Sequence, residues 1–189
     1  MSGVVRLLVL DRPVLLDLAA GDLAAAGRAA GIEFPPFFAG ENWLWRLHVD
    51  RMLLHPASVG WLSRAVVERS TGVVVGHAGF HFHPDAYGSV EIGYTVVPGE
   101  RGRGLAKEIV GELLAFAGAA GVLTVRASVS PGNAASLAVI RHWGFRPAGE
   151  QWDEEDGLEL VFELPVQGRQ GLRELAGPVG RAPDRPVHG

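Results

Sequence analysis

The stretch PGERGRGLA, residues 98–106, joins a predicted strand to a predicted helix. Residues 89–97 are typical of a strand, and residues 104–120 carry apolar side chains at helical spacing. At such a junction the first N–H groups of the helix are unpaired, and the helix dipole adds partial positive charge. Gly102 and Gly104 let an anion approach the backbone closely, and Arg101 and Arg103 add charged donors. The stretch therefore predicts a cradle for a pyrophosphate group.

Two common phosphate-binding motifs do not fit this cradle. A P-loop needs Lys and then Ser or Thr after its second glycine, but Leu105 and Ala106 follow Gly104. The dinucleotide-binding fingerprint needs a third glycine at a position that Lys107 occupies, and no ribose-binding acid is evident in the following strand. The cradle therefore belongs to a third type.

The segments around the cradle predict a mixed α/β sheet, neither a doubly wound parallel fold nor a sandwich. Strands are expected at residues 4–10, 61–68, 73–82, 89–97, 123–129, 145–152 and 158–164, the last two as a hairpin. Helices are expected at residues 13–32 (one or two), 43–54, 104–120 and 134–142, with a loop or extended piece at 34–38. Residues 1–164 form one domain, and residues 165–189 are predicted to be a poorly ordered or loosely docked tail.

The amino-acid composition excludes several classes of partner and of catalytic chemistry. The 189 residues are 48% hydrophobic and 20% charged, with a net charge of -4, which favours a globular domain without a nucleic-acid partner. The absence of cysteine excludes thiolate nucleophiles, acyl-cysteine intermediates and cysteine zinc sites, so any thiol must come from a cofactor. No apolar run approaches the roughly 20 residues of a membrane span, and no signal peptide is evident. We therefore expect a cytoplasmic protein.

The pattern Arg101-x-x-Gly104-x-Ala106 resembles the coenzyme A loop of the GCN5-related N-acetyltransferase (GNAT) superfamily. The phrase Glu-Ile-Gly-Tyr at 91–94 precedes it, and an Asn-x-x-Ser helix start and a Gly-Phe strand entry follow at 133–136 and 144–145. Together they are most similar to the ribosomal-protein N-terminal (RimJ/RimL-type) acetyltransferase branch. The resemblance covers residues 73–164, and residues 1–72 fit in the order of elements only.

The resemblance implies a single mixed, mostly antiparallel central sheet flanked by helices, with acetyl-CoA as cosubstrate and no metal. It implies that the backbone at Val96 and Val97 contacts the pantetheine arm, which Asn133 touches from the other side. The residues implied to hold the pyrophosphate are Arg101, Gly102, Arg103, Gly104, Leu105 and Ala106.

Catalysis needs a base for the amine and a group for the departing thiolate. Glu91 matches the base position of the histone-acetylating branch, although a salt-bridged strand residue would look the same. The acidic turn Asp153–Asp156 is the rival base, although it also fits a solvated turn. The tyrosine that usually protonates the thiolate is replaced by Ile140, and the resemblance implies that Ser136 protonates or hydrogen-bonds the sulfur, although a hydroxyl at a helix start would look the same.

Two other groups of side chains allow more than one interpretation. Three histidines at even spacing, His77, His81 and His83, suggest a metal, but no carboxylate set accompanies them and half-buried histidines are common. Aromatic residues of the first helices could line an acceptor pocket, and they also suit core packing: Phe34, Phe37, Phe38, Trp43 and Trp45.

We thus expect an acyl-CoA-dependent N-acetyltransferase that acts by direct attack. Its acceptor is the primary amine of a small molecule or a protein N-terminus. The rival hypothesis is a non-catalytic coenzyme A-binding sensor or scaffold module. No nucleic acid or membrane is expected as a partner, and a homodimer is left open.

Overall fold

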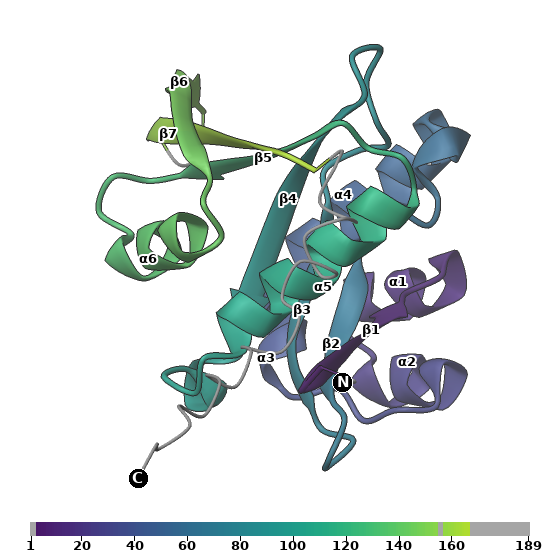
Figure 1. Ribbon diagram of the computed structural model, residues 1–189. Helices are drawn as coiled ribbons and strands as arrows, with labels where there is room; N and C mark the ends of the chain where they lie inside the picture. The colour runs from purple at the N-terminus through teal and green to yellow at the C-terminus, as the bar shows by residue number, and fades with distance from the viewer. Residues whose placement is uncertain (1–2, 155–156, 167–189) are drawn as a thin grey trace, which may run out of the picture.

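The computed structural model describes residues 3–154 and 157–166 and has a central mixed sheet with helices on both faces (Figure 1). The strands lie in the order β1-β2-β3-β4-β5-β7-β6. Their bounds are β1 (Val5–Val9), β2 (Arg64–Glu68), β3 (Val74–Phe80), β4 (Ser89–Val96), β5 (Thr124–Val129), β6 (Arg146–Asp153) and β7 (Gly157–Pro165). Neighbouring strands pair antiparallel except β4 and β5, which are parallel. The predicted mixed, mostly antiparallel sheet is confirmed.

The helices follow the predicted order. Their bounds are α1 (Arg12–Ala19), α2 (Leu23–Ala30), α3 (Phe37–Gly40), α4 (Asn42–Leu54), α5 (Leu105–Ala119) and α6 (Ala134–His142), with 3-10 turns η1 (Pro56–Ser58) and η2 (Pro98–Glu100). The loop or extended piece expected at 34–38 is wrong in part, because Phe37 and Phe38 belong to α3. Pro36 has helical dihedral angles there and precedes the first turn, where its missing N–H costs nothing.

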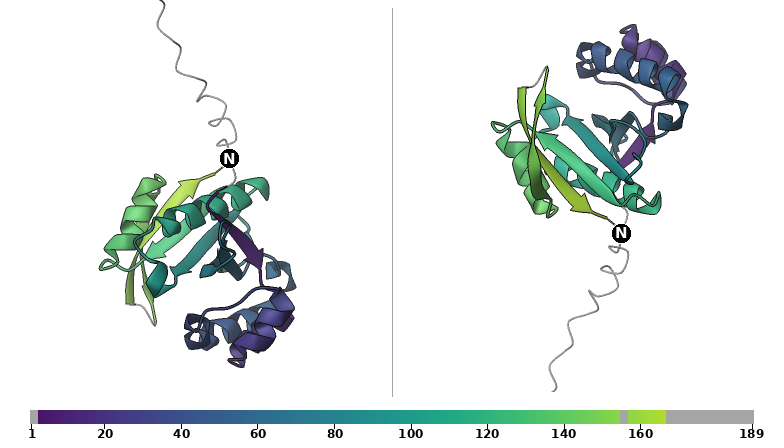
Figure 2. Two further views of the ribbon diagram at one scale, coloured as in Figure 1. Left: turned by 90° about the horizontal axis from the view of Figure 1, so that it is seen from below. Right: turned by 90° about the horizontal axis from the view of Figure 1, so that it is seen from above.

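Two apolar cores lie on opposite faces of the sheet. On one face α5 packs its stripe, including Ile109 and Leu113, against β4 residues such as Ile92. On the other face α1 and α4 cover β2 residues that alternate with those of the first core, and Trp45 is buried among them. Figure 2 shows α1, α2 and α4 on one side of the sheet and α5 and α6 on the other. The period of two along each strand therefore fixes which side chains meet which helix.

The described chain ends in two residues that still belong to the fold. Pro165 ends β7, and Val166 is buried and donates its N–H to the carbonyl of Leu123 at 2.9 Å. The remainder of the predicted tail, residues 167–189, lies outside the described residues. The extent of the domain and the state of its tail stay predictions.

A buried arginine, Arg64, binds the chain segment 60–62 that leads into β2. Arg64 is only 2% exposed, and its guanidinium donates to the carbonyls of Gly60, Trp61 and Leu62. It also lies over the ring of Phe116 on α5, with 4.3 Å from Cζ to the ring centroid. Burial lowers the pKa of Arg64 to about 10, which still leaves it charged at neutral pH. Its hydrogen bonds and ring contact replace the water that the charge has lost.

Removing this guanidinium is expected to destabilise the fold strongly. Arg64→Ala removes a donor from three carbonyls, of which only that of Trp61 keeps another, the N–H of Phe80, and it leaves a gap beside Phe116, so the free energy of unfolding should fall by about 2–3 kcal/mol. Urea unfolding at pH 7 measures this loss. The exposed Arg28→Ala is the matched control, and a loss no larger than the control's would contradict the role given to Arg64.

Candidate functional site

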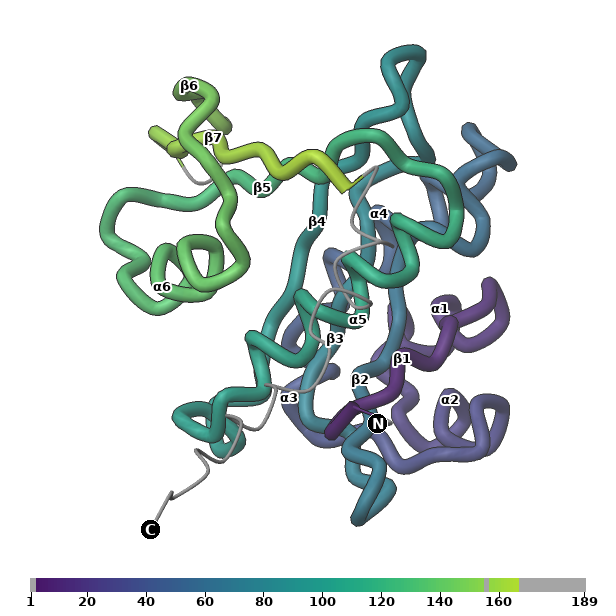
Figure 3. Tube along the Cα trace, viewed as in Figure 1, coloured from purple at the N-terminus to yellow at the C-terminus, as the bar shows by residue number. Residues whose placement is uncertain are grey.

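The central feature is the short pairing between β4 and β5. The two parallel strands pair over only three residues each, from Ser89 to Glu91 and from Thr124 to Arg126. Beyond this point β4 continues to Val96 along β3 alone, and Figures 1 and 3 show β5 diverging from it. The edge of β4 that faces β5 is therefore open after Glu91.

The backbone groups exposed at this opening follow from the strand register. Glu91 accepts from the N–H of His81 at 2.9 Å, and Val97 donates to Val75 at 2.9 Å, so odd-numbered residues of β4 bond to β3. The N–H and C=O groups of the even-numbered residues point the other way, into the opening. Tyr94 is one of these residues, and sequence reasoning missed it because the register comes from pairing with β3.

The register separates the two valines predicted to contact the pantetheine arm. Val96 is even-numbered and directs its backbone into the opening, which supports the prediction for it. Both backbone groups of Val97 are engaged, because its N–H bonds to Val75 and its carbonyl accepts from the N–H of Glu100 at 2.8 Å. The geometry therefore favours Val96 and Tyr94 over Val97 as the residues that meet a ligand here.

The predicted cradle forms the lower end of the opening, at the start of α5. Gly102 and Gly104 have φ angles of +80° and +79°, in the left-handed region that favours glycine. A Cβ at either position would meet no atom within 4 Å, and Gly104, the N-cap of α5, makes no side-chain capping bond. The first amides of α5 thus receive no cap from their own N-cap residue and follow glycines with space around them, as an anion site requires.

The two arginines of the cradle behave differently. Arg101 donates from Nε to the carbonyl of Val96 at 3.2 Å, at the mouth of the opening. Arg103 pairs with both Glu100 and Glu68, so it ties the loop to the end of β2. The Thr71 hydroxyl, and after it Arg103, hold the pKa of Glu68 below its usual value. Arg103 is thus already paired with two carboxylates of the protein, and its contact with pyrophosphate stays a prediction.

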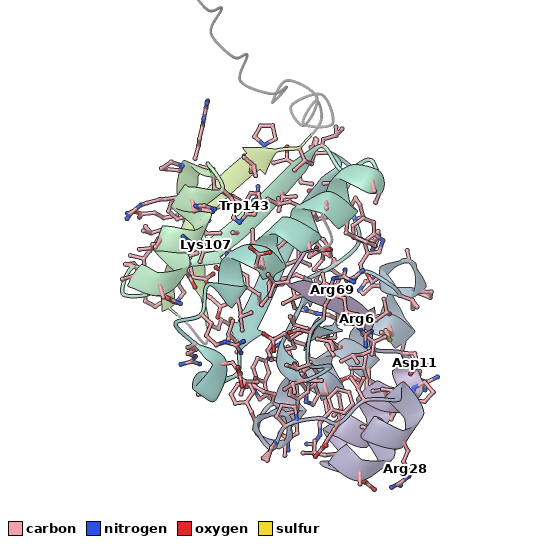
Figure 4. All side chains as sticks on the ribbon, turned by 60° about the horizontal axis from the view of Figure 1, so that its bottom comes forward. Arg6, Asp11, Arg28, Arg69, Lys107 and Trp143 are labelled. Carbon is pink, nitrogen blue, oxygen red and sulfur yellow. The ribbon has the colours of Figure 1, made fainter. Side chains whose placement is uncertain are left out.

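The helix that follows β5, α6, lies across the gap from β4 in Figure 1. Asn133 caps this helix, accepting the N–H of Ser136 at 3.0 Å, and its contact with the pantetheine arm stays a prediction. Trp143 at the end of α6 donates from its indole N–H to the carbonyl of Lys107 on α5 at 3.0 Å, and Figure 4 shows the two residues together. A Cβ at Gly111 would lie 2.7 Å from the Trp143 ring, so glycine permits this close approach. The two helices that flank the opening are therefore fixed to each other.

Glu91 points to the other face of the sheet, at the apex of the opening. It lines a groove of about 240 Å³. Other residues that line this groove include His81, Phe82, His83, Asp85 and Arg126. Its carboxylate lies 3.7 Å from Nδ1 of His81, and its side chain is 22% exposed. Arg126 is paired with Glu163 at 2.7 Å. Glu91 is the last residue of β4 that pairs with β5, so its carboxylate lies where the gap between the two strands begins. This position fits the predicted base.

The acids of the rival site lie at the tip of the β6–β7 hairpin. Asp153 ends β6 opposite Gly157, and Glu154 follows in the turn. Glu155 and Asp156 lie outside the described residues. The choice between Glu91 and this turn stays open to experiment.

The three histidines that suggest a metal lie in different surroundings. His77 is buried among the rings of Phe37, Phe38 and Trp45, His81 faces Glu91, and His83 bonds to Ser58 at 2.9 Å. Within residues 3–154 and 157–166, no group of three His, Cys, Asp or Glu side chains could hold a metal ion. Of the aromatic candidates for an acceptor pocket, Phe34, Phe38 and Trp45 are buried in the second core.

Comparison with known proteins gives a family match and many similar folds. The model of the acetyltransferase (GNAT) domain matches residues 29–146. Ribosomal-protein-S5-alanine acetyltransferase from Vibrio fischeri superimposes with a TM-score of 0.61 at 16% identity, covering 89% of this chain and 96% of that one. Mutant forms of the spermidine/spermine N-acetyltransferase SpeG from Vibrio cholerae give 0.61 at 14% identity, with 91% and 98% covered. The protein yncA from Salmonella typhimurium, solved with acetyl-CoA, gives 0.55 at 22% identity, with 87% and 95% covered.

No curated protein sequence matches the chain significantly. In the part of the chain that the structure describes, each helix is too short or too polar to cross a bilayer.

Two buried histidines, His48 on α4 and His77 on β3, make the stability of the fold depend on pH. Burial lowers the pKa of His77 to about 4 and that of His48 to about 3, the latter with help from nearby cations. The unfolded chain, with a histidine pKa near 6.5, therefore binds protons more readily than the folded one below that pH. The stability due to neutral burial is complete above about pH 6.5 and is lost as the pH falls toward the folded values.

Between pH 6 and 4, each of these histidines should lower the free energy of unfolding by up to about 1.4 kcal/mol per pH unit. His77→Gln cannot titrate, so its stability should fall less steeply with acid than that of the natural chain. Urea unfolding at several pH values measures the slope, with the exposed His142→Gln as the matched control. Equal slopes in all three proteins would mean that His77 is not buried in its neutral form.

Proposed function

Since this chain belongs to the acetyltransferase (GNAT) family, we propose that it transfers an acetyl group from acetyl-CoA to a primary amine by direct attack. One observation carries the proposal. The opening between β4 and β5 has the uncapped start of α5 at one end and, at the other, an apex where Glu91 faces a groove. A donor held on one face of the sheet could thus meet an acceptor held on the other.

The residues present fit acetyl-CoA. The open edge offers the N–H and C=O of Tyr94 and the N–H of Val96 to the amides of a pantetheine arm, as a further strand would use them, whereas the carbonyl of Val96 accepts from Arg101. The left-handed glycines and first amides of α5, residues 102–106, suit a pyrophosphate. Acetyl-CoA supplies the thioester, and the chain supplies placement and polarisation of its carbonyl by backbone N–H groups.

The amine must lose a proton before or during attack, and Glu91 is the favoured base. Its partial exposure permits transfer directly or through one water molecule. His81 lies across the strand pair, with its Nδ1 3.7 Å from the Glu91 carboxylate. The proton then leaves through the groove to solvent.

The lining of the groove supports a cationic acceptor. Two carboxylates, Asp85 and Glu91, line it, while the positive charge of Arg126 is compensated by Glu163. Such a surface attracts an ammonium group. The similar structures are named for a ribosomal-protein alanine and for spermidine, so both a protein N-terminus and a small amine are sensible acceptors to test.

Thiol release from acetyl-CoA tests the activity directly. The panel should contain spermidine, short peptides with alanine or serine at the N-terminus, and a sample without amine. Release that depends on an amine supports the transferase. Tight coenzyme A binding without release on any acceptor would favour a sensor or scaffold, and absence of binding would contradict the site itself.

Charge at the start of α5 should oppose cofactor binding. Gly104→Asp places a carboxylate where the pyrophosphate is expected, so coenzyme A affinity should fall at least about tenfold, or roughly 1.4 kcal/mol. Gly104→Asn has nearly the same shape and tolerates the left-handed conformation similarly, so it should lose less. Calorimetry on both folded variants separates charge from strain. Unchanged affinity in Gly104→Asp would remove the cradle from the account.

Neutralising the base should slow turnover without weakening cofactor binding. Glu91→Gln keeps the shape but cannot accept a proton, so kcat should fall about 10²-fold or more, while coenzyme A affinity barely changes. The residual rate should rise with pH as more free amine is present. The comparison protein combines Asp153→Asn, Glu154→Gln, Glu155→Gln and Asp156→Asn. If this protein loses the rate and Glu91→Gln does not, the base lies in the hairpin turn.

A further inference from the structure

A histidine that the proposed mechanism does not use lies beside the favoured base. His81 follows β3 directly, and its N–H donates to the carbonyl of Glu91 at 2.9 Å, so the two residues form a cross-strand pair. Their side chains lie on the same face of the sheet, with Nδ1 of His81 3.7 Å from the Glu91 carboxylate. The His81 side chain is 49% exposed and that of Glu91 22%, so a ligand in the groove reaches His81 more easily.

The other ring nitrogen of His81 faces the open part of β4. A Cβ added to Gly93 would lie 3.1 Å from Nε2, so glycine at this position leaves room for the ring. The pairing of β4 with β5 ends at Glu91, and Gly93 therefore lies beyond it, on the open edge. The imidazole thus spans two positions of β4, with Nδ1 toward Glu91 and Nε2 over the start of the opening.

Charged and titratable groups surround His81 on several elements. The acids are Glu91 on β4 and Asp85 in the loop after β3, and both line the groove. Arg51 of α4 donates to the His81 carbonyl at 3.2 Å. The other groups are paired or neutral: Arg126 with Glu163, His83 with Ser58, and the buried His48. Among the described residues, Glu91 is the one carboxylate within 4 Å of a His81 ring nitrogen, so it is the group that would offset a charge there.

On the basis of the proposed function, we infer that His81 takes the amine proton on Nε2, and that Glu91 acts through it by accepting the Nδ1–H. Imidazole, with an ordinary pKa of about 6.5, is a stronger base than a carboxylate at about 4.3, and a base matched to neutral pH transfers protons most effectively. A hydrogen bond to Glu91 fixes the tautomer whose Nε2 is free to accept a proton. A small rotation of the two side chains closes the 3.7 Å separation, and catalytic hydrogen bonds commonly shorten when substrate binds.

The proton and electron balance needs no further reactant. The ammonium group of the acceptor gives one proton to Nε2, and Glu91 offsets the charge of the imidazolium. The neutral amine nitrogen then forms a bond to the acetyl carbon, the carbon–sulfur bond breaks, and its electron pair stays on sulfur. The second nitrogen proton passes to the sulfur, which leaves as the thiol. His81 finally returns its proton to water in the groove.

The ring tautomer of His81 tests this link without cofactor or turnover. The ¹⁵N signals of a neutral imidazole show which ring nitrogen carries the proton. In the natural chain the His81 proton should be on Nδ1, and Glu91→Ala, which removes its acceptor, should abolish that preference. Glu33→Ala, at an exposed position outside the groove, is the matched control and should change nothing. A proton on Nε2 in the natural chain, or a tautomer that is the same in Glu91→Ala, would overturn the inference.

Kinetics supply the second test. His81→Gln should lower kcat about 10²-fold or more with coenzyme A affinity unchanged, because general bases typically contribute about 10²–10⁴-fold. The exposed His142→Gln on α6 is the control. His81→Gln combined with Glu91→Gln should be little slower than His81→Gln alone, because the two groups act as one unit. A near-normal rate in His81→Gln beside a slow Glu91→Gln would make Glu91 the direct base, and fully additive losses would separate the two groups; either result contradicts the inference.

The same assays distinguish this failure from failure of the proposed function. If no amine causes thiol release from acetyl-CoA in the natural chain, the transferase itself is wrong and the role of His81 falls with it. If release depends on an amine and His81→Gln releases thiol at the natural rate, only the role of His81 is wrong.

Discussion

The early end of the β4–β5 pairing is the constraint on which the candidate site depends. A parallel pair normally continues along both strands, yet here it stops after Glu91 and Arg126. Backbone N–H and C=O groups need partners, so the open edge of β4 is prepared for a strand-like ligand. The hydrogen bond of Trp143 to Lys107 and its packing on Gly111 hold α6 against α5, and thus keep the two helices beside the opening at a fixed separation.

The cradle relies on backbone geometry more than on side-chain charge. Two left-handed glycines and the uncapped start of α5 supply donors that need no reorganisation. Arg103 is used to hold the loop against β2, through two carboxylates, so its charge is largely compensated within the protein. Buried polar groups lie on both faces of the sheet: Arg64 binds the carbonyls of residues 60–62 and packs against Phe116 of α5, and His77 packs against Trp45 on the opposite face.

Sequence reasoning found what depends on local pattern and missed what depends on pairing. Over the described residues, the period of apolar residues predicted every strand and every longer helix; the four-residue helix after Pro36 and the two 3-10 turns were missed, since such short elements carry no period. The cradle was found because its glycines adjoin a helix start. Val96 and Val97 were both named from the resemblance and Tyr94 was not considered, because the register of β4 depends on β3, which is distant in the sequence. The ion pairs of Arg103 were likewise invisible, because Glu68 lies 35 positions away.

Residue-resolved amide hydrogen exchange, with and without coenzyme A, tests the central claim most directly. The amides of Tyr94 and Val96 should exchange quickly in the free protein and become protected when coenzyme A is added, together with those of residues 102–106. Val97, whose N–H bonds to Val75, should be protected in both states and is the internal control. Protection of Tyr94 and Val96 before any ligand is added, or no gain in protection with it, would contradict an open edge of β4 that receives the cofactor.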